Sequence, residues 1–374
     1  MADARYFWDE LFGPGEGNEG GVQVAMRLLR KRGQPFLLLP TQARAAATAL
    51  ELYAAQTLRA RLAKAALRGL FRAGWPAGAE SLTFTLAGQA PFTRFVSART
   101  GAQPAAVPCF AVLAGNPAMA SQRFLVLAFE ANQRPVAVVK AGLTPSARAL
   151  VQREGAFLAS ASAKVAGIPH LQDHFESARA SAFGLDYYPG RSPRPGEEGA
   201  LPALLGGWVD AQHTTPVAKL PDWIRLEQAG AKNASFVPVA QALRPREVHP
   251  TIYHGDFAPW NIKVSAQGNW TVLDWERGEL AGLPGWDWFH YTLQTGLLVE
   301  RLATLPLIQR IGHLLDSEAF RTYARQAGVA GLERPLVLAY LVHCVEVLKP
   351  AEGLAATQEL LTALGARWPK QTQA

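Results

Sequence analysis

The chain has 374 residues, of which 49% are hydrophobic and 18% charged, with a formal net charge of +7. This composition is typical of a folded globular protein, and no segment approaches the ~20 consecutive apolar residues that a membrane span requires. The first residues, MADARYFWDELF, include acids and lack the apolar core of a signal peptide, and the only two cysteines, Cys109 and Cys344, lack metal-site spacing. We therefore expect a cytoplasmic protein without structural disulfides or zinc.

Most of the positive charge lies in the N-terminal part of the chain. Residues 1–107 contain 13 Lys and Arg against 7 Asp and Glu, a net charge of +6, whereas residues 251–374 have a net charge of −2.

From Gln42 to Arg72 the chain is rich in Ala and Leu, which predicts one long helix. Its basic residues would share one face and its apolar residues another: Arg61, Lys64, Arg68 and Arg72 against Leu58, Leu62, Ala66 and Leu70. In the simplest interpretation, this helix packs its apolar face on a domain core and exposes its basic face to solvent. The alternative is that the basic face binds nucleic acid or a membrane surface.

After one or two short strands predicted within residues 81–99, the pattern between Cys109 and Lys140 changes to strands. The runs CFAVL, RFLVLAFE and VAVVK are separated by short loops, which predicts an antiparallel meander. Thr144 and Pro145 then form a helix start, with Thr as the N-cap and Pro at the first helical position. The predicted helix covers residues 146–163.

Glu154 lies on the apolar side of that predicted helix, between Leu150 and Leu158. A carboxylate in such a position is costly unless a cation meets it. Lys140, at the end of the strand that leads into the helix, is the nearest candidate by topology. The alternative is a lysine at a strand end and a glutamate merely at the helix surface.

The segment DYYPGRSPRPGEEG separates two differently patterned regions and is typical of a hinge. A helix is predicted at about residues 201–212, and residues 297–364 are mostly helical by periodicity. We therefore expect three parts: an N-terminal accessory segment at residues 1–104, a sheet-rich lobe at 105–190 and a helical lobe at 191–374.

Polar residues cluster in the stretch YHGDFAPWNI, which covers residues 253–262. Asp256 and Asn261 have the spacing D-x-x-x-x-N, and Asp274 follows the predicted strand at residues 270–273. Oxygen ligands from Asn261 and Asp274 would suit Mg²⁺, which keeps water and phosphate oxygens as the rest of its shell. Asp256 would then be available to accept a proton from an attacking hydroxyl.

HGDFAPWN together with LDWE and GLPGWDW resembles the aminoglycoside phosphotransferase and choline-kinase-like family, whose members are relatives of the protein kinases. The resemblance spans about residues 108–290, and Lys140 and Glu154 stand where the family's strand lysine and helix glutamate belong. It implies an α+β, bilobal protein-kinase-like fold, with an antiparallel-sheet N-lobe, a helical C-lobe and an extra N-terminal α/β segment.

The same resemblance implies an ATP-dependent and Mg²⁺-dependent phosphoryl transfer. Asp256 would be the catalytic base or the residue that orients the hydroxyl, and Asn261 and Asp274 would bind Mg²⁺. Lys140, held by Glu154, would contact the α and β phosphates of ATP.

Further roles follow from the resemblance. His254 would brace the catalytic loop, and Asp287 would stabilise it rather than touch substrate. The loop AGNPAMASQ has one glycine instead of the kinase G-x-G-x-x-G pattern, and backbone amides with Ser121 could still meet phosphates. The adenine pocket would include Leu185 and Tyr187.

The acceptor is a small molecule with a hydroxyl group, and a sugar, an amino alcohol, a lipid-linked compound or an aminoglycoside all fit. The weak negative charge of residues 251–374 does not favour a polycation. Tryptophans near the motif either pack the core or stack on a ligand: Trp260, Trp275, Trp286 and Trp288. The open alternatives are a pseudokinase that binds nucleotide without transfer, and a membrane-associated or nucleic-acid-associated protein led by its basic helix. We do not expect nucleic acid as the main partner, and peripheral membrane contact stays open.

Overall fold

The computed structural model describes residues 7–13, 21–53, 58–76, 78–101, 107–116, 119–161, 165–350 and 352–368. The chain divides into two compact units. Unit 1 comprises residues 1–159 and 169–188, and unit 2 comprises residues 160–168 and 189–374. Each unit is described by itself below.

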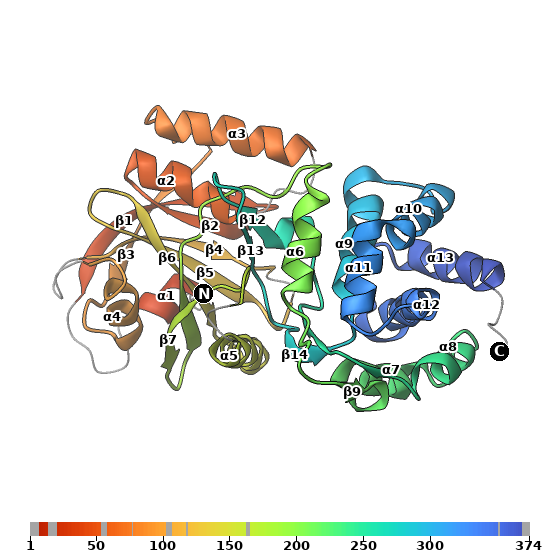
Figure 1. The fold of residues 1–374 in the computed structure, drawn as a ribbon. Coiled ribbons are helices and arrows are strands. Elements are labelled where there is room, and N and C mark those ends of the chain that lie inside the picture. Colours follow the sequence, from red (N-terminus) through yellow and green to blue (C-terminus); the bar gives the residue numbers. More distant parts are fainter. Residues whose placement is uncertain are drawn as a thin grey trace. The chain divides into compact units, whose positions relative to one another are not determined.

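Unit 1 is built on an antiparallel sheet that has eight strands over the described residues, in the order β3-β1-β2-β4-β5-β6-β8-β7 (Figure 1). These strands are β1 (Val22–Lys31), β2 (Gln34–Pro40), β3 (Glu80–Leu86), β4 (Cys109–Ala114), β5 (Arg123–Phe129), β6 (Pro135–Gly142), β7 (Leu171–Glu176) and β8 (Ser181–Asp186). The three strands of the expected meander are β4, β5 and β6, and they pair in register as antiparallel neighbours.

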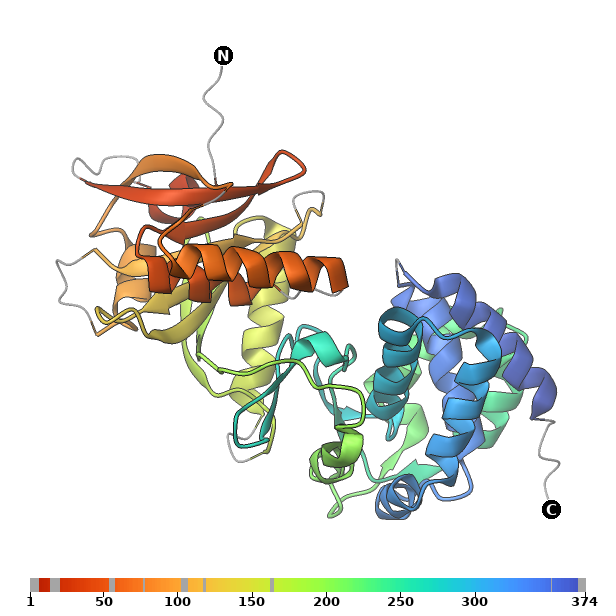
Figure 2. The same cartoon turned by 90° about the horizontal axis from the view of Figure 1, so that it is seen from above.

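Helices pack on both faces of this sheet (Figures 1 and 2). They are α1 (Phe7–Phe12), α2 (Ala43–Ala49), the short η1 (Leu50–Leu52), α3 (Leu58–Arg72), α4 (Pro91–Ser97) and α5 (Pro145–Ser160). Side chains alternate along a strand, so Phe110 and Val112 of β4 lie in the core with α1 and α4. Ala111, between them, lies in the second core with α2 and α3.

The N-terminal segment differs from its expected structure in three ways. The long helix expected from Gln42 to Arg72 is interrupted, because Tyr53 has an extended backbone after η1 and α3 begins only at Leu58. Of residues 81–99, the first part forms one strand, β3, as expected, but the second part forms the helix α4. The expected division at residue 104 does not separate compact units, since β2 pairs with β4 and the first three strands extend the same sheet.

The orientation of α3 is also different from the expected one. Leu62, expected on the buried side, is 63% exposed, whereas Phe71 is fully buried. Lys64 and Arg68, expected in solvent, turn toward the unit. The ammonium group of Lys64 donates to the carbonyl oxygen of Tyr53 at 2.7 Å, and Arg68 forms an ion pair with Glu51 at 2.6 Å. Two polar partners from the preceding turn therefore decide which face packs inward.

Unit 2 is mostly helical. Its α-helices are α6 (Leu201–Gly206), α7 (Pro221–Gly230), α8 (Phe236–Leu243), α9 (Trp286–Gln294), α10 (Thr304–Asp316), α11 (Glu318–Gln326), α12 (Glu333–His343) and α13 (Leu354–Arg367). Two π-helical segments, η5 (Thr295–Glu300) and η6 (Cys344–Leu348), continue α9 and α12. Short 3-10 turns are η2 (Glu198–Ala200), η3 (Val217–Lys219) and η4 (Pro259–Asn261). The helix expected at residues 201–212 ends at Gly206.

Unit 2 also contains short antiparallel strand pairs, and two of them carry the motif. The strands are β9 (Thr215–Pro216), β10 (Glu247–Val248), β11 (Thr251–Tyr253), β12 (Ile262–Val264), β13 (Trp270–Val272) and β14 (Glu279–Gly282). β11 pairs with β14 and β12 pairs with β13. The expected α+β class, with one antiparallel-sheet unit and one helical unit, is confirmed. In the part of the chain that the structure describes, no helix has the length and hydropathy of a membrane span.

Candidate active site

The HGD segment is a tight turn between β11 and η4. Gly255 has φ of +77°, and a Cβ atom there would lie 2.8 Å from the Cβ of Arg277, so both the backbone conformation and the space require glycine. This turn places Asp256 at its end, with a half-buried carboxylate. Asn261, at the end of η4, follows it closely.

Asp287 holds the turn from the first turn of α9. Its carboxylate accepts hydrogen bonds from the backbone N–H groups of His254, at 2.7 Å, and Gly255, at 3.1 Å. Burial raises the pKa of Asp287 to about 8, although the two N–H donors pull that pKa downward. The expected supporting role of Asp287 is confirmed by these contacts.

His254 joins the HGD turn to the strand that precedes Asp274. Its Nε2 contacts the carbonyl oxygen of Leu273 at 2.9 Å, and its Nδ1 accepts from the backbone N–H of Asp256 at 3.1 Å. These partners fix the tautomer, with the proton on Nε2. Burial lowers the pKa of His254 to about 4, so the ring is neutral. The ring also lies against Trp275, with centroids 4.5 Å apart. The expected bracing role of His254 is confirmed.

Both carboxylate oxygens of Asp256 have a fixed partner. Oδ2 accepts from the amide nitrogen of Asn261 at 2.8 Å, and Oδ1 contacts Nε2 of His290 at 3.2 Å. Burial raises the pKa of Asp256, but the hydrogen bond from His290 outweighs it, and the pKa lies below its usual value. The group is an ionised, oriented acceptor, suited to aligning a hydroxyl more than to strong base catalysis.

The two expected metal ligands are brought together by the backbone. The N–H of Leu273 donates to the carbonyl oxygen of Asn261 at 2.7 Å, which sets Asp274 beside the end of η4. Asp274 has φ of +71°, a conformation that non-glycine residues adopt at a cost and that is frequent at functional sites. Because the amide nitrogen of Asn261 is bonded to Asp256, its Oδ1 is the atom suited to a cation. An amide oxygen and a carboxylate form a hard donor set that fits Mg²⁺.

Lys140 and Glu154 meet in unit 1. Lys140 lies in β6, between Leu125 of β5 and Phe183 of β8, and Glu154 lies on the inner side of α5. Nζ of Lys140 forms an ion pair with Oε2 of Glu154, and the side chains are 11% and 2% exposed. The expected ion pair is confirmed, and the cost of burying the carboxylate is met by the lysine.

The loop between β4 and β5 is attached to the start of α5. The carbonyl oxygen of Ala120 accepts from the hydroxyl groups of Thr144, at 2.5 Å, and Ser146, at 2.8 Å. Thr144 also accepts from the N–H of Ala147 at 3.2 Å, so the expected N-cap is confirmed. Ser121, next to Ala120, is partly exposed, and its expected contact with phosphate stays a prediction.

The expected adenine segment continues from β8. Leu185 pairs with Val138 of β6, and the N–H of Tyr187 donates to the carbonyl oxygen of Val136 at 2.9 Å. The phenol group of Tyr187 donates to Glu51 at 3.0 Å, and the ring packs in the core with α2 and α3. Any contact of Tyr187 with a nucleotide would therefore come from its backbone.

Most tryptophans near the motif belong to the core. Trp275 and Trp286 are fully buried, and Trp288 is 5% exposed. Trp260, in η4, is only partly buried. The packing interpretation therefore holds for three of these four rings, and Trp260 is the one with surface available to a ligand.

Two functional candidates were missed in the sequence. His290 of α9 contacts Asp256, and the hydroxyl group of Tyr340 of α12 lies 2.8 Å from the other ring nitrogen of His290. His290 is three residues after Asp287 and shares its helix face, which is a local signal. The position of Tyr340, far along the chain, had no such signal.

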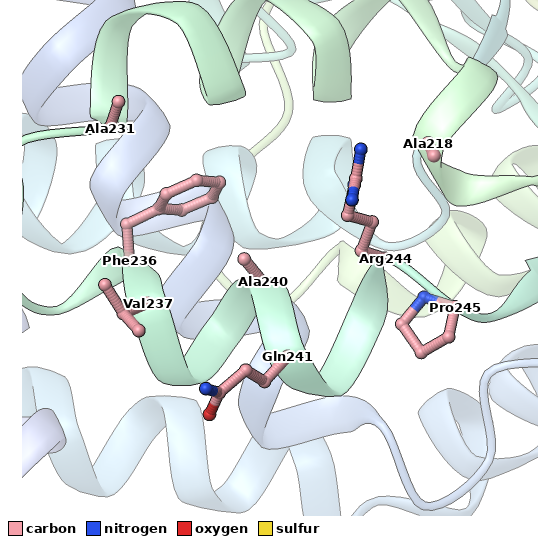
Figure 3. Close-up of a pocket in the computed structure, with 8 residues that line it drawn as sticks. All are labelled: Ala218, Ala231, Phe236, Val237, Ala240, Gln241, Arg244 and Pro245. Carbon is pink, nitrogen blue, oxygen red and sulfur yellow. The ribbon is translucent and has the colours of Figure 1, made fainter.

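A shallow apolar groove of about 700 Å³ lies elsewhere in unit 2, over α8 (Figure 3). Phe236, Val237 and Ala240 line it, with Arg244 toward one end. None of the expected site residues lines this groove.

Comparison of the sequence with protein-family models gives no match, and comparison with curated proteins gives none either. Among solved structures, the chain is similar to a thermostable mutant of the aminoglycoside phosphotransferase APH(4)-Ia in complex with AMP-PNP and hygromycin B. The identity is 14% and the TM-score 0.43, over 68% of this chain and 93% of that one.

Two further structures are similar at the same level. For a Ralstonia eutropha protein assigned as an aminoglycoside phosphotransferase, the identity is 13% and the TM-score 0.41, over 75% of this chain and 97% of that one. For a Haemophilus somnus protein assigned as a fructosamine-3-kinase, the identity is 15% and the TM-score 0.39, over 65% of this chain and 87% of that one. Because these scores are low, the chemistry proposed below is derived from the chain's own side chains.

Proposed function

We propose that the protein is a Mg²⁺-dependent phosphotransferase that moves the γ-phosphate of ATP to a hydroxyl group of a small molecule. The observation that carries the proposal is the arrangement in unit 2. There the ionised carboxylate of Asp256, fixed through both of its oxygens, lies beside the amide of Asn261. A backbone hydrogen bond from Leu273 to Asn261 brings the next residue, Asp274, close to this amide. Phosphoryl transfer needs mainly positioning and neutralisation of charge, and this donor set supplies both.

Asp256 would orient the acceptor. Its ionised carboxylate accepts a hydrogen bond from the acceptor hydroxyl and directs the oxygen lone pair at the γ-phosphorus. As the new O–P bond forms, the bond between the γ-phosphorus and the bridging oxygen breaks, ADP leaves, and the hydroxyl proton passes to Asp256. His290 and Asn261 keep the carboxylate from turning away.

Asn261 Oδ1 and the carboxylate of Asp274 would hold Mg²⁺. When bound, the ion neutralises charge on the phosphate oxygens of the nucleotide. The positive φ of Asp274 is a conformation that non-glycine residues adopt at a cost, and a role in binding Mg²⁺ would account for its retention.

The nucleotide would also use groups of unit 1. The ammonium group of Lys140, held in place by Glu154, would contact the α and β phosphates through its positive charge. Ser121 and neighbouring amides would contact phosphate, and the backbone from Leu185 to Tyr187 would line the adenine pocket.

A screen for ADP release tests the proposal. The protein, MgATP and single candidates from panels of sugars, amino alcohols, amino acids and aminoglycosides are incubated, and ADP is followed by a coupled assay. Asp316→Asn, at an exposed carboxylate of α10, is the matched control for Asp256→Asn. We expect acceptor-dependent ADP release that Asp256→Asn loses and Asp316→Asn keeps. Binding of ATP without ADP release for any acceptor would indicate a pseudokinase instead.

A further inference from the structure

The carboxylate of Asp256 is the end of a buried hydrogen-bonded series of side chains. Nε2 of His290 is 3.2 Å from Asp256 Oδ1, and Nδ1 of His290 is 2.8 Å from the hydroxyl oxygen of Tyr340. His290 and Tyr340 are 3% and 1% exposed, so protein groups rather than bulk water fix their hydrogen bonds.

The direction of each hydrogen bond follows from the groups involved. An ionised carboxylate only accepts, so Nε2 of His290 carries the proton that faces Asp256. In the neutral ring Nδ1 is then an acceptor, and the hydroxyl group of Tyr340 donates to it. Both donors of the series thus face the Asp256 end.

We propose that Tyr340 sets the Nε2-protonated tautomer of His290, and that His290 is thereby a positioning residue that holds the Asp256 carboxylate in its productive rotamer. This inference deepens the proposed phosphotransferase and rests on it for its catalytic meaning. The geometry itself, from phenol to carboxylate, does not depend on the reaction.

The packing explains why this series is rigid. His290 lies in the middle of α9, whose first turn carries Asp287, so one helix supports the HGD turn through Asp287 and orients Asp256 through His290. Tyr340 lies in α12 and contacts the other ring nitrogen. The imidazole of α9 is therefore held at both nitrogen atoms, by Asp256 of the HGD turn and by Tyr340 of α12.

The first test identifies the tautomer of His290 by NMR. Long-range ¹H–¹⁵N correlation spectra of the protein with ¹⁵N-labelled histidine distinguish Nε2–H from Nδ1–H. We expect the Nε2–H form for His290 in the wild type and a mixed signal in Tyr340→Phe. Tyr323→Phe removes another buried phenol, one that accepts from the N–H of Gly285, and controls for loss of packing or stability. It should leave the His290 signal unchanged.

The second test measures the slow release of ADP from MgATP when water is the only acceptor. His290→Leu should reduce this rate by about 10–100-fold, as is typical when a supporting partner of a site group is removed. His290→Gln should recover part of it, because its amide N–H can reach Asp256. The affinity for MgATP should stay the same in both variants.

The two tests separate the possible failures. If the wild type releases no ADP with water or with any acceptor, the proposed function is wrong, while the spectra still decide the tautomer. If the spectra show Nδ1–H in the wild type, or if Tyr340→Phe leaves the His290 signal unchanged, the tautomer-setting role of Tyr340 is overturned. Equal turnover of His290→Leu and the wild type would overturn the positioning role.

Discussion

Two aspartates close to the HGD turn have opposite environments. Asp256 receives hydrogen bonds from His290 and Asn261, and its pKa lies below the usual value. Asp287 is enclosed among α9, the turn and aromatic rings, and burial raises its pKa to about 8. The first arrangement suits a group that works in the charged state, and the second suits a group that holds backbone N–H donors in place.

Asp287→Ala should destabilise unit 2. It removes the side chain that accepts from two backbone N–H groups, and it leaves both of these buried donors without an acceptor. We expect a loss of about 1–3 kcal/mol in the free energy of unfolding, measured in urea. An unchanged free energy of unfolding would show that the two hydrogen bonds to His254 and Gly255 contribute nothing.

His343 predicts a pH dependence of stability. It lies in α12 against Trp286, its Nδ1 has no hydrogen-bond partner among the described residues, and burial lowers its pKa to about 3. The charges of Arg225 and Arg277 add to that lowering. In the unfolded chain a histidine has a pKa near 6.5, so below that pH the unfolded state binds a proton that the folded state does not. Stability is then fully present above pH 6.5 and is lost as the pH falls toward 3.

The measurement compares the wild type with His343→Leu in urea at pH 7 and pH 5. Between these values the wild type should lose about 2 kcal/mol more than the variant, because only the wild type exposes a histidine that takes up a proton. Other buried histidines, such as His254, contribute equally to both proteins. If the free energies of unfolding of the wild type and His343→Leu differed by the same amount at pH 7 and pH 5, a neutral His343 in the folded state would be contradicted.

At the scale of elements, α3 is connected to the segment after β8. Arg68 pairs with Glu51, and Glu51 accepts a hydrogen bond from the phenol group of Tyr187. The sequence pattern predicted a basic helix with a solvated cationic face. The contacts show that two of its cations face inward and that one of them supports the expected adenine segment.

Arg68→Glu should therefore affect ATP binding. The new carboxylate would repel Glu51 and loosen its hydrogen bond with Tyr187. We expect ATP to bind roughly twofold to fivefold more weakly, which corresponds to about 0.4–1 kcal/mol for a partly exposed pair. Titration calorimetry measures this, with Arg59→Glu on the exposed side of α3 as the control. Equal affinities of wild type and Arg68→Glu would mean that α3 is independent of the nucleotide site.

The parts of the fold that the sequence predicted are those with local signals. The alternation of β4 to β6, the Thr144 cap and the spacing of Asp256 and Asn261 are all set by neighbours in the chain. The inward face of α3 and the contact between His290 and Tyr340 depend on partners that the fold brings together. Periodicity alone cannot show such partners, because a helix face becomes buried only when another element covers it.

At the scale of the whole molecule, the N-terminal segment completes the sheet of unit 1. β2 lies beside β4, and its Leu37 and Leu39 are fully buried in the core with α2 and α3. Removal of β1 to β3 would leave β4 as an unpaired edge and expose the residues that pack against this core.

A chain that begins at residue 107 should therefore not fold as an independent phosphotransferase. We expect aggregation on expression, or a circular dichroism spectrum without a cooperative thermal transition, whereas the full chain unfolds cooperatively. A soluble truncated protein that binds ATP like the full chain would show that residues 1–104 are accessory, as the sequence pattern suggested.

The central claim is that Asp256 orients the acceptor hydroxyl, whereas Asn261 and Asp274 bind Mg²⁺. ATP titration calorimetry with and without Mg²⁺, run beside turnover of the same samples, tests it most directly through Asp256→Asn and Asp274→Asn. Asp256→Asn should bind MgATP like the wild type and lose about 10²–10⁴-fold in turnover, or roughly 3–5 kcal/mol in barrier. Asp274→Asn should lose the Mg²⁺-dependent part of ATP affinity together with turnover. Normal turnover of Asp256→Asn alongside normal MgATP binding by Asp274→Asn would contradict the account.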